Sequence, residues 1–153
     1  MFLVNLKNMK QRKAFCNLAM AAINSDGKQD IREIVILQNL VKEMIIHNDI
    51  DLEDSKAFSK YLLDNIPKEK LEQKDIDKNL EVFVDTSIHI KKTVLFELIA
   101  LAYSDKDLSL TEKELIELIA CKFDFSNELI TEMLNIIVSL NSSFENIANI
   151  IQN

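Results

Sequence analysis

The chain contains one glycine and one proline in 153 residues, Gly27 and Pro67. Tight hairpin turns depend on glycine, asparagine and proline at set positions, so a chain this poor in glycine and proline disfavours a many-stranded fold. The same scarcity excludes glycine-rich phosphate loops, dinucleotide-binding turns and glycine-flanked nucleophile elbows, because each needs at least two glycines. The sequence therefore predicts an all-α protein without these three kinds of active site.

Composition favours one globular domain, residues 1–153. Hydrophobic residues make up 48% and charged residues 28% of the chain, which is typical of a folded domain long enough to bury a real core. Apolar spacing and helix-start signals predict a bundle of about seven to eight helices. Their expected ranges are 8–24, 31–47, 52–65, 67–74, 77–103, 110–123, 126–140 and 141–151.

Two of these helices involve a further interpretation. Val82, Val84 and Ile88 alternate as a strand would, but apolar positions also continue at helical spacing toward residue 102. A lone strand would leave its backbone groups without partners, so we interpret 77–103 as helix, broken near Thr86. The helix over 31–47 is apolar around most of its circumference, and we expect it at the centre of the bundle.

The clearest helix start is Ser109-Leu-Thr-Glu112, a capping box. A related layout precedes it by 79 residues, with Asp30-Ile-Arg-Glu33 at the helix start. The repeat predicts two pseudo-symmetric three-helix units, over about 9–64 and 87–141. The matching positions are Ser25, Asp26 and Glu33 in the first unit and Ser104, Asp105 and Glu112 in the second.

This element, a small residue, an aspartate, a turn and a glutamate seven residues after the aspartate, resembles the tellurite-resistance TerB-like family. A domain of that family also forms the N-terminus of a membrane-anchored DnaJ-type co-chaperone. The resemblance covers most of the chain and both halves. It implies an all-helical bacterial cytoplasmic domain with a role in stress response, whose acidic residues are suspected of binding a divalent metal.

Six carboxylates are the candidate metal ligands, and Ca²⁺ or Mg²⁺ is the kind of ion that such oxygen ligands suit. The alternative is structural, because acidic residues at helix starts are also favoured by capping and by the helix dipole. An EF-hand is excluded, since a loop starting at Asp105 lacks the required glycine and terminal glutamate. The six candidates are Asp26, Asp30, Glu33, Asp105, Asp107 and Glu112.

The sequence contains no convincing set of catalytic residues, so we expect a protein that is not an enzyme. Cys16 and Cys121 lie in apolar helical stretches, which predicts buried free thiols. Glu97 lies in the most apolar helix. For this residue we favour a boundary position over a buried one, because burial of a carboxylate requires pairing or protonation.

Two hypotheses of function follow. The first is a TerB-like stress protein with a divalent cation at the acidic turns. The second is a helical protein–protein interaction module without metal, recruiting a protein that the sequence does not identify; a homodimer is also left open.

The formal net charge of −7 argues against a nucleic-acid partner. The longest apolar run, 94–103, is interrupted by Glu97 and is too short for a transmembrane segment, so we expect a cytoplasmic protein.

Overall fold

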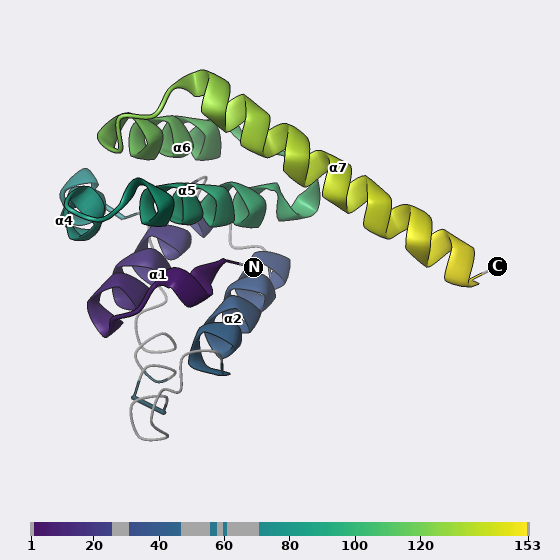
Figure 1. Cartoon of the computed structure of the whole chain (residues 1–153), viewed down its shortest axis with the longest axis horizontal. Helices are drawn as coiled ribbons and strands as arrows, with labels where there is room; N and C mark the ends of the chain where they lie inside the picture. Colours follow the sequence, from purple (N-terminus) through teal and green to yellow (C-terminus); the bar gives the residue numbers. More distant parts are fainter. Residues whose placement is uncertain (1, 26–30, 47–55, 58–59, 61–70, 153) are drawn as a thin grey trace.

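A computed structural model describes residues 2–25, 31–46, 56–57, 60 and 71–152 (Figure 1). No strand occurs within these ranges, which confirms the all-α prediction. Most of the expected helix over 52–65 lies outside these ranges, as do residues 67–70 of the one expected over 67–74. The elements are η1 (Leu3–Asn5), α1 (Met9–Ile23), α2 (Ile31–Ile46), α4 (Gln73–Val84), α5 (Ile88–Ala102), η2 (Tyr103–Asp105), α6 (Leu110–Lys122) and α7 (Asn127–Gln152), where η marks a short 3-10 helix.

Helix α5 is the centre of the bundle. It contacts η1, α1, α2, α6 and α7, and Figure 1 shows it between α6 on one side and α1 on the other. Because α5 is apolar on nearly every face, it can be covered from several directions at once. The expectation that helix 31–47 is central is wrong: α2 packs at one side of the bundle, and its Ile31 and Val35 are exposed.

The core joins the two halves of the chain, as the sequence predicts. One contiguous cluster of buried side chains includes residues of α2, α5 and α6. Apolar residues at helical spacing in the two units predict that Leu37, Val41, Leu98, Ile99, Ile116 and Ile119 are buried together, and this is confirmed. The full count of seven to eight helices and the pseudo-symmetric repeat stay predictions, because part of the first unit lies outside the described residues.

The segment 77–103 is helical on both sides of a short break. Helix α4 ends at Val84 and α5 starts at Ile88. The hydroxyl of Thr86 donates to the Phe83 carbonyl at 2.7 Å, and the Ser87 hydroxyl accepts the Ile90 N–H at 3.3 Å. These bonds satisfy backbone groups that the break leaves open, so the predicted interruption near Thr86 is confirmed.

The N-terminal segment 2–8 contributes two side chains to the core. Leu3 and Leu6 are fully buried. The Arg12 guanidinium, itself buried, donates to the carbonyl of Leu6 at 2.8 Å and to that of Lys7 at 3.2 Å. The guanidinium, which has five N–H donors, therefore holds the N-terminal segment against α1.

Helix α7 runs unbroken for 26 residues, and Figure 1 shows its C-terminal part projecting beyond the other helices. The expected break at Asn141-Ser-Ser143 is wrong. The Ser143 hydroxyl donates to the carbonyl of Ser139 one turn earlier, at 2.9 Å. A serine bonded in this way stays within the helix instead of capping a new one. No helix in the described ranges combines the length and apolarity needed to cross a membrane.

Candidate functional site

The acidic turn between α5 and α6 uses its carboxylates to shape its own backbone. Asp105 Oδ1 accepts the Asp107 N–H at 3.1 Å, and Asp107 Oδ1 accepts the Leu108 N–H at 2.9 Å. Lys106 between them has a left-handed φ of 73°, and its N–H donates to the Tyr103 carbonyl at 3.0 Å. Aspartates that bond nearby backbone amides are typical of tight turns that lead into helices.

Glu112 completes the predicted capping box at the start of α6. Its Oε2 accepts the Ser109 N–H at 2.7 Å, while the Ser109 hydroxyl accepts the Glu112 N–H at 3.2 Å. The Glu112 side chain is buried. One of its two carboxylate oxygens is thus engaged in satisfying a helix-start amide.

Glu33 lies in the first turn of α2, at the position that the repeat matches to Glu112, and it is also buried. A negative charge there is favoured by the partial positive charge of the helix N-terminus. Asp26 and Asp30, the other two predicted ligands of the first unit, lie outside the described residues.

The two turn regions meet in space. The Ser25 hydroxyl, at the end of α1, donates to Thr111 Oγ1, in the first turn of α6, at 3.4 Å across 86 positions of sequence. Element η2, which contains Asp105, also contacts α2, which starts with Glu33 in its first turn. Ser25 therefore lies beside the start of α6, and the η2 turn lies beside α2.

Among the residues that the structure describes, no three His, Cys, Asp or Glu side chains gather closely enough to hold a metal ion. Asp105, Asp107 and Glu112 each accept a backbone amide of their own turn. The contacts of the second unit are thus those of the capping alternative. A metal-ligand role for the six predicted residues stays a prediction.

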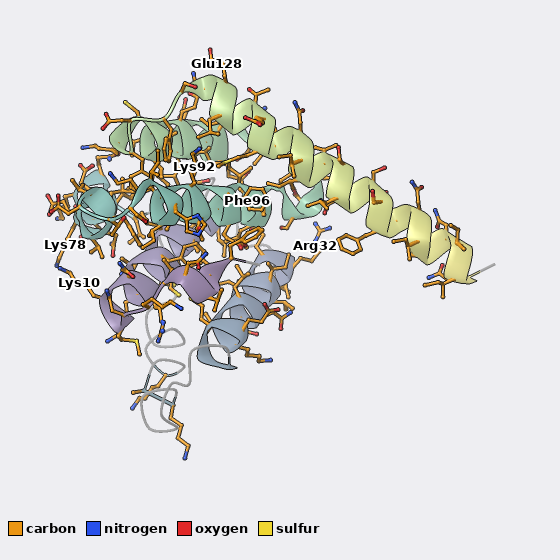
Figure 2. All side chains as sticks on the ribbon, viewed as in Figure 1. Lys10, Arg32, Lys78, Lys92, Phe96 and Glu128 are labelled. Atoms are coloured by element: carbon orange, nitrogen blue, oxygen red, sulfur yellow. The ribbon has the colours of Figure 1, made fainter. Side chains whose placement is uncertain are left out.

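Glu97 is buried, with 5% of its surface exposed, so the favoured boundary position is wrong. Its Oε1 accepts the N–H of Phe2 at 2.6 Å. The Phe2 ring packs edge-on against Phe96, labelled in Figure 2, with ring centroids 5.7 Å apart. Burial raises the pKa of the Glu97 carboxyl, and the Phe2 amide opposes that rise by bonding to the charged form.

The two cysteines differ in their surroundings. Cys16 is buried in α1, and burial raises the pKa of its thiol. Cys121 is exposed near the end of α6, so the prediction of two buried thiols is wrong for that residue.

An apolar surface on α7 is the feature that the sequence reasoning missed. Apolar residues follow one another at alternating intervals of three and four along the helix: Ile130, Met133, Ile137, Leu140, Phe144, Ile147 and Ile151. Met133 and Ile137 pack on the bundle with 8% and 4% of their surface exposed. The next four are 48%, 67%, 51% and 77% exposed. We call these four, Leu140, Phe144, Ile147 and Ile151, the free seam.

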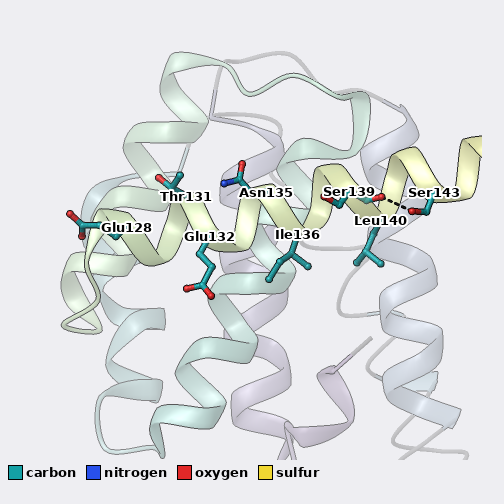
Figure 3. A pocket seen from close by; sticks show the side chains of 8 residues that line it. All are labelled: Glu128, Thr131, Glu132, Asn135, Ile136, Ser139, Leu140 and Ser143. Carbon is teal, nitrogen blue, oxygen red and sulfur yellow. Dashed lines mark hydrogen bonds between the residues drawn. The ribbon is translucent and has the colours of Figure 1, made fainter.

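The chain around the free seam carries almost no charge. From Ser139 to Gln152, Glu145 is the one ionisable side chain, and it pairs with Lys106 of the η2 turn. An open hollow runs along the same helix toward its start, lined by Glu132, Ile136 and Leu140 among other residues of α7 (Figure 3). The seven-residue spacing was visible in the sequence, but the assumed break at 141–143 divided it.

Comparison of the chain with protein-family models, with curated proteins and with solved structures finds no match.

Proposed function

We propose that this chain is a non-enzymatic helical interaction module that docks a partner along the free seam of α7. The observation that carries the proposal is the change in exposure along one apolar stripe. Ile137 is the last buried residue of α7, and every residue from 142 to 152 is exposed. The stripe continues across that boundary without a change in spacing.

The exposed side chains are too many and too close together to be incidental. Single apolar residues on a protein surface are normal, but a contiguous patch of more than a few hundred Å² usually marks a binding surface. Phe144, Ile147 and Ile151 are each more than half exposed, and Ile150 beside them is 77% exposed. Large aliphatic and aromatic groups left in water at this density favour association.

The spacing also indicates the kind of partner. Apolar residues at alternating intervals of three and four form a straight seam along an α-helix, and such a seam fits against another helix. An extended peptide would match a sheet edge or pockets spaced at every second residue instead. The partner surface is therefore expected to be helical.

A second candidate function is the metal-responsive one implied by the resemblance to the tellurite-resistance TerB-like family. It is supported by the contact of Ser25 with Thr111, which brings together the two turn regions that the repeat relates. In this proposal a divalent cation of the Ca²⁺ or Mg²⁺ type binds at Asp26, Asp30, Glu33, Asp105, Asp107 and Glu112. The resemblance to this family implies that the chain is a bacterial cytoplasmic stress protein.

Site-specific photocross-linking in living cells tests the interaction module. A photoreactive amino acid is placed at Phe144 on the free seam and, in a matched control, at Ser142 on the opposite face of the same helix. Both positions are exposed, so neither change should disturb the fold. We expect a polypeptide adduct from position 144 and little or none from position 142.

The adducts are then identified by mass spectrometry. An adduct specific to position 144, whether with another protein or with a second copy of the chain, supports the docking surface. Equal yields at 144 and 142, or no polypeptide adduct at either, would contradict it.

A further inference from the structure

We infer that the partner of the free seam is a second copy of this chain, paired antiparallel through the C-terminal half of α7. The inference rests on the proposed docking function and identifies its occupant. In the pairing, Phe144 of one copy lies opposite Ile147 of the other. Leu140 lies opposite Ile151, so the same four residues of each copy form a twofold-symmetric contact.

The first argument is the regularity of the seam. In heptad terms Phe144 and Ile151 occupy a positions, and Leu140 and Ile147 occupy d positions. No polar residue interrupts these positions between Ile130 and Ile151. An antiparallel partner places a residues against d residues, which is what the pairs of Phe144 with Ile147 and of Leu140 with Ile151 require.

The second argument is the lack of charge beside the seam. Helices that select a different partner carry complementary Lys and Glu at the e and g positions. Here those positions are Asn141, Ser143, Ala148 and Ile150. They offer nothing for an oppositely charged partner to recognise, and nothing that repels an identical helix.

Glu145 does not oppose the pairing, although its two copies lie near the twofold axis. It occupies a b position, which points away from the seam. Its carboxylate already pairs with Lys106 of its own chain. The charge is therefore partly balanced before two copies meet.

A membrane surface fits the free seam less well. Helices that lie on membranes combine an apolar face with Lys and Arg, which attract anionic lipid headgroups. The segment from Ser139 to Gln152 contains no Lys or Arg, and the chain has a formal net charge of −7. An anionic bilayer would repel such a chain.

The same net charge favours the antiparallel orientation. Parallel helices would bring two bundles of like charge together at one end, whereas antiparallel helices place the bundles at opposite ends. Antiparallel neighbours also oppose their helix dipoles. The exposed stretch 142–152 is about 16 Å long at a rise of ~1.5 Å per residue.

A contact built on four apolar side chains per copy implies a reversible dimer. The free seam has four apolar side chains per copy, whereas a standard stable interface of ~800 Å² per partner involves roughly 20–30 residues on each side. We therefore expect a monomer–dimer equilibrium in the micromolar range instead of a permanent dimer.

Sedimentation velocity on the purified full chain, from about 1 to several hundred micromolar, tests the inference. The wild-type chain should shift from monomer to dimer as its concentration rises. The double variant Phe144→Ser, Ile147→Ser should associate at least ~100-fold more weakly, because it removes the central pair of the contact. The control variant Ser142→Asp, on the opposite face, should dimerise like the wild type.

Each outcome is decisive. A wild-type chain that stays monomeric throughout, or a double variant that dimerises equally well, overturns the second-copy inference. If the monomeric chain then binds phospholipid vesicles, or cross-links from position 144 to a different protein, the occupant is a membrane or that protein. In the latter case the proposed docking function still stands.

Disulfide trapping tests the orientation, in a Cys121→Ser background that removes the exposed native thiol. One chain carries Leu140→Cys and another, with a tag of different size, carries Ile151→Cys. Antiparallel pairing predicts that the mixed disulfide forms faster than either symmetric one. Faster symmetric disulfides would overturn the antiparallel arrangement.

Discussion

The backbone N–H of Phe2 donates to Oε1 of Glu97 at 2.6 Å, across 95 positions of sequence. The bond ties the start of the chain to the central helix α5, at the point where Phe2 also packs on Phe96. A carboxylate in such an apolar place costs free energy when it is charged. Its protonation should therefore affect how stable the protein is.

The first prediction concerns Glu97→Gln. Because the Glu97 pKa is raised by burial, the folded chain holds this proton over a pH range where the unfolded chain has released it. The free energy of unfolding contributed by Glu97 is then highest at acid pH and falls as pH rises through the raised pKa. Glutamine keeps an acceptor for Phe2 but cannot ionise, so the variant should not show this fall.

The measurement is urea unfolding of both proteins between pH 4 and pH 8. We expect the variant to gain stability over the wild type as the pH rises. Glu117→Gln, at an exposed position of α6, is the control and should change neither stability nor its pH dependence. If the free energies of unfolding of the wild type and Glu97→Gln differ by the same amount at every pH, Glu97 ionises alike in the folded and unfolded states.

The second prediction concerns the shared core. Leu98→Ala or Ile116→Ala should each lower the free energy of unfolding by about 2–5 kcal/mol, because both side chains are buried where helices meet. Leu110→Ala, at a position 72% exposed, should change it by less than ~0.5 kcal/mol. Chemical denaturation measures all three. If both core variants lose less than ~1 kcal/mol of unfolding free energy, α5 and α6 do not pack together in the core as this structure has them.

The third prediction concerns the thiols. A thiol reagent at pH 8 should label Cys121 rapidly in the native chain and Cys16 only after denaturation, because Cys16 is buried and its pKa is raised. Mass spectrometry of tryptic peptides locates the label. Rapid native labelling of Cys16 would mean that α1 is less well covered than it is in this structure.

The fourth prediction separates metal ligands from caps at the acidic turns. In the double variant Glu33→Gln, Glu112→Gln, glutamine preserves the capping hydrogen bond but removes the charge that a hard cation needs. If the carboxylates bind metal, the wild type should gain roughly 2.7 kcal/mol of stability at a hundredfold excess of ion over its dissociation constant, and the variant much less. If they only cap helices, Ca²⁺ and Mg²⁺ should change neither protein.

Thermal unfolding with and without each ion, at low salt and near neutral pH, gives the answer. Asp105→Asn is a second probe, because it removes one predicted charged ligand outside the capping box. An absence of any saturable ion effect in the wild type would contradict the metal-binding candidate and leave the interaction module standing.

Much of the fold was predictable because local signals and burial agreed. The capping box at Ser109 and Glu112 formed as its spacing required. The break near Thr86 was found because the apolar pattern is helical on both sides of it. Predicted core positions on α2, α5 and α6 are buried, because a stripe of apolar residues at helical spacing has few other ways to leave water.

The errors came from features that depend on distant parts of the chain. Glu97 is buried because Phe2, far away in sequence, supplies a hydrogen bond and an apolar cover. Helix α2 looked central because it is apolar on many sides, yet α5 occupies the centre. Neither arrangement can be read from a local window of sequence.

The break assumed at Asn141-Ser-Ser143 had a local cause. Asn and Ser favour helix starts, but serine can also bond to the carbonyl one turn before it, as Ser143 does with Ser139. Reading through these residues would have revealed the apolar repeat from Ile130 to Ile151. The interpretation of Asn141-Ser-Ser143 as a helix start divided the apolar repeat that forms the candidate docking surface.

Hydrogen exchange along α7 tests the central claim most directly, because it reports whether the projecting half has a partner. In dilute protein, amides of residues 142–152 should exchange much faster than those of 129–138, which lie where the helix packs on the bundle, since an isolated helical segment of that length is marginally stable. At high concentration the 142–152 amides should become protected in the wild type but not in Phe144→Ser, Ile147→Ser. If residues 129–138 and 142–152 are equally protected in dilute wild-type protein, the claim that the free seam is uncovered in the monomer is wrong.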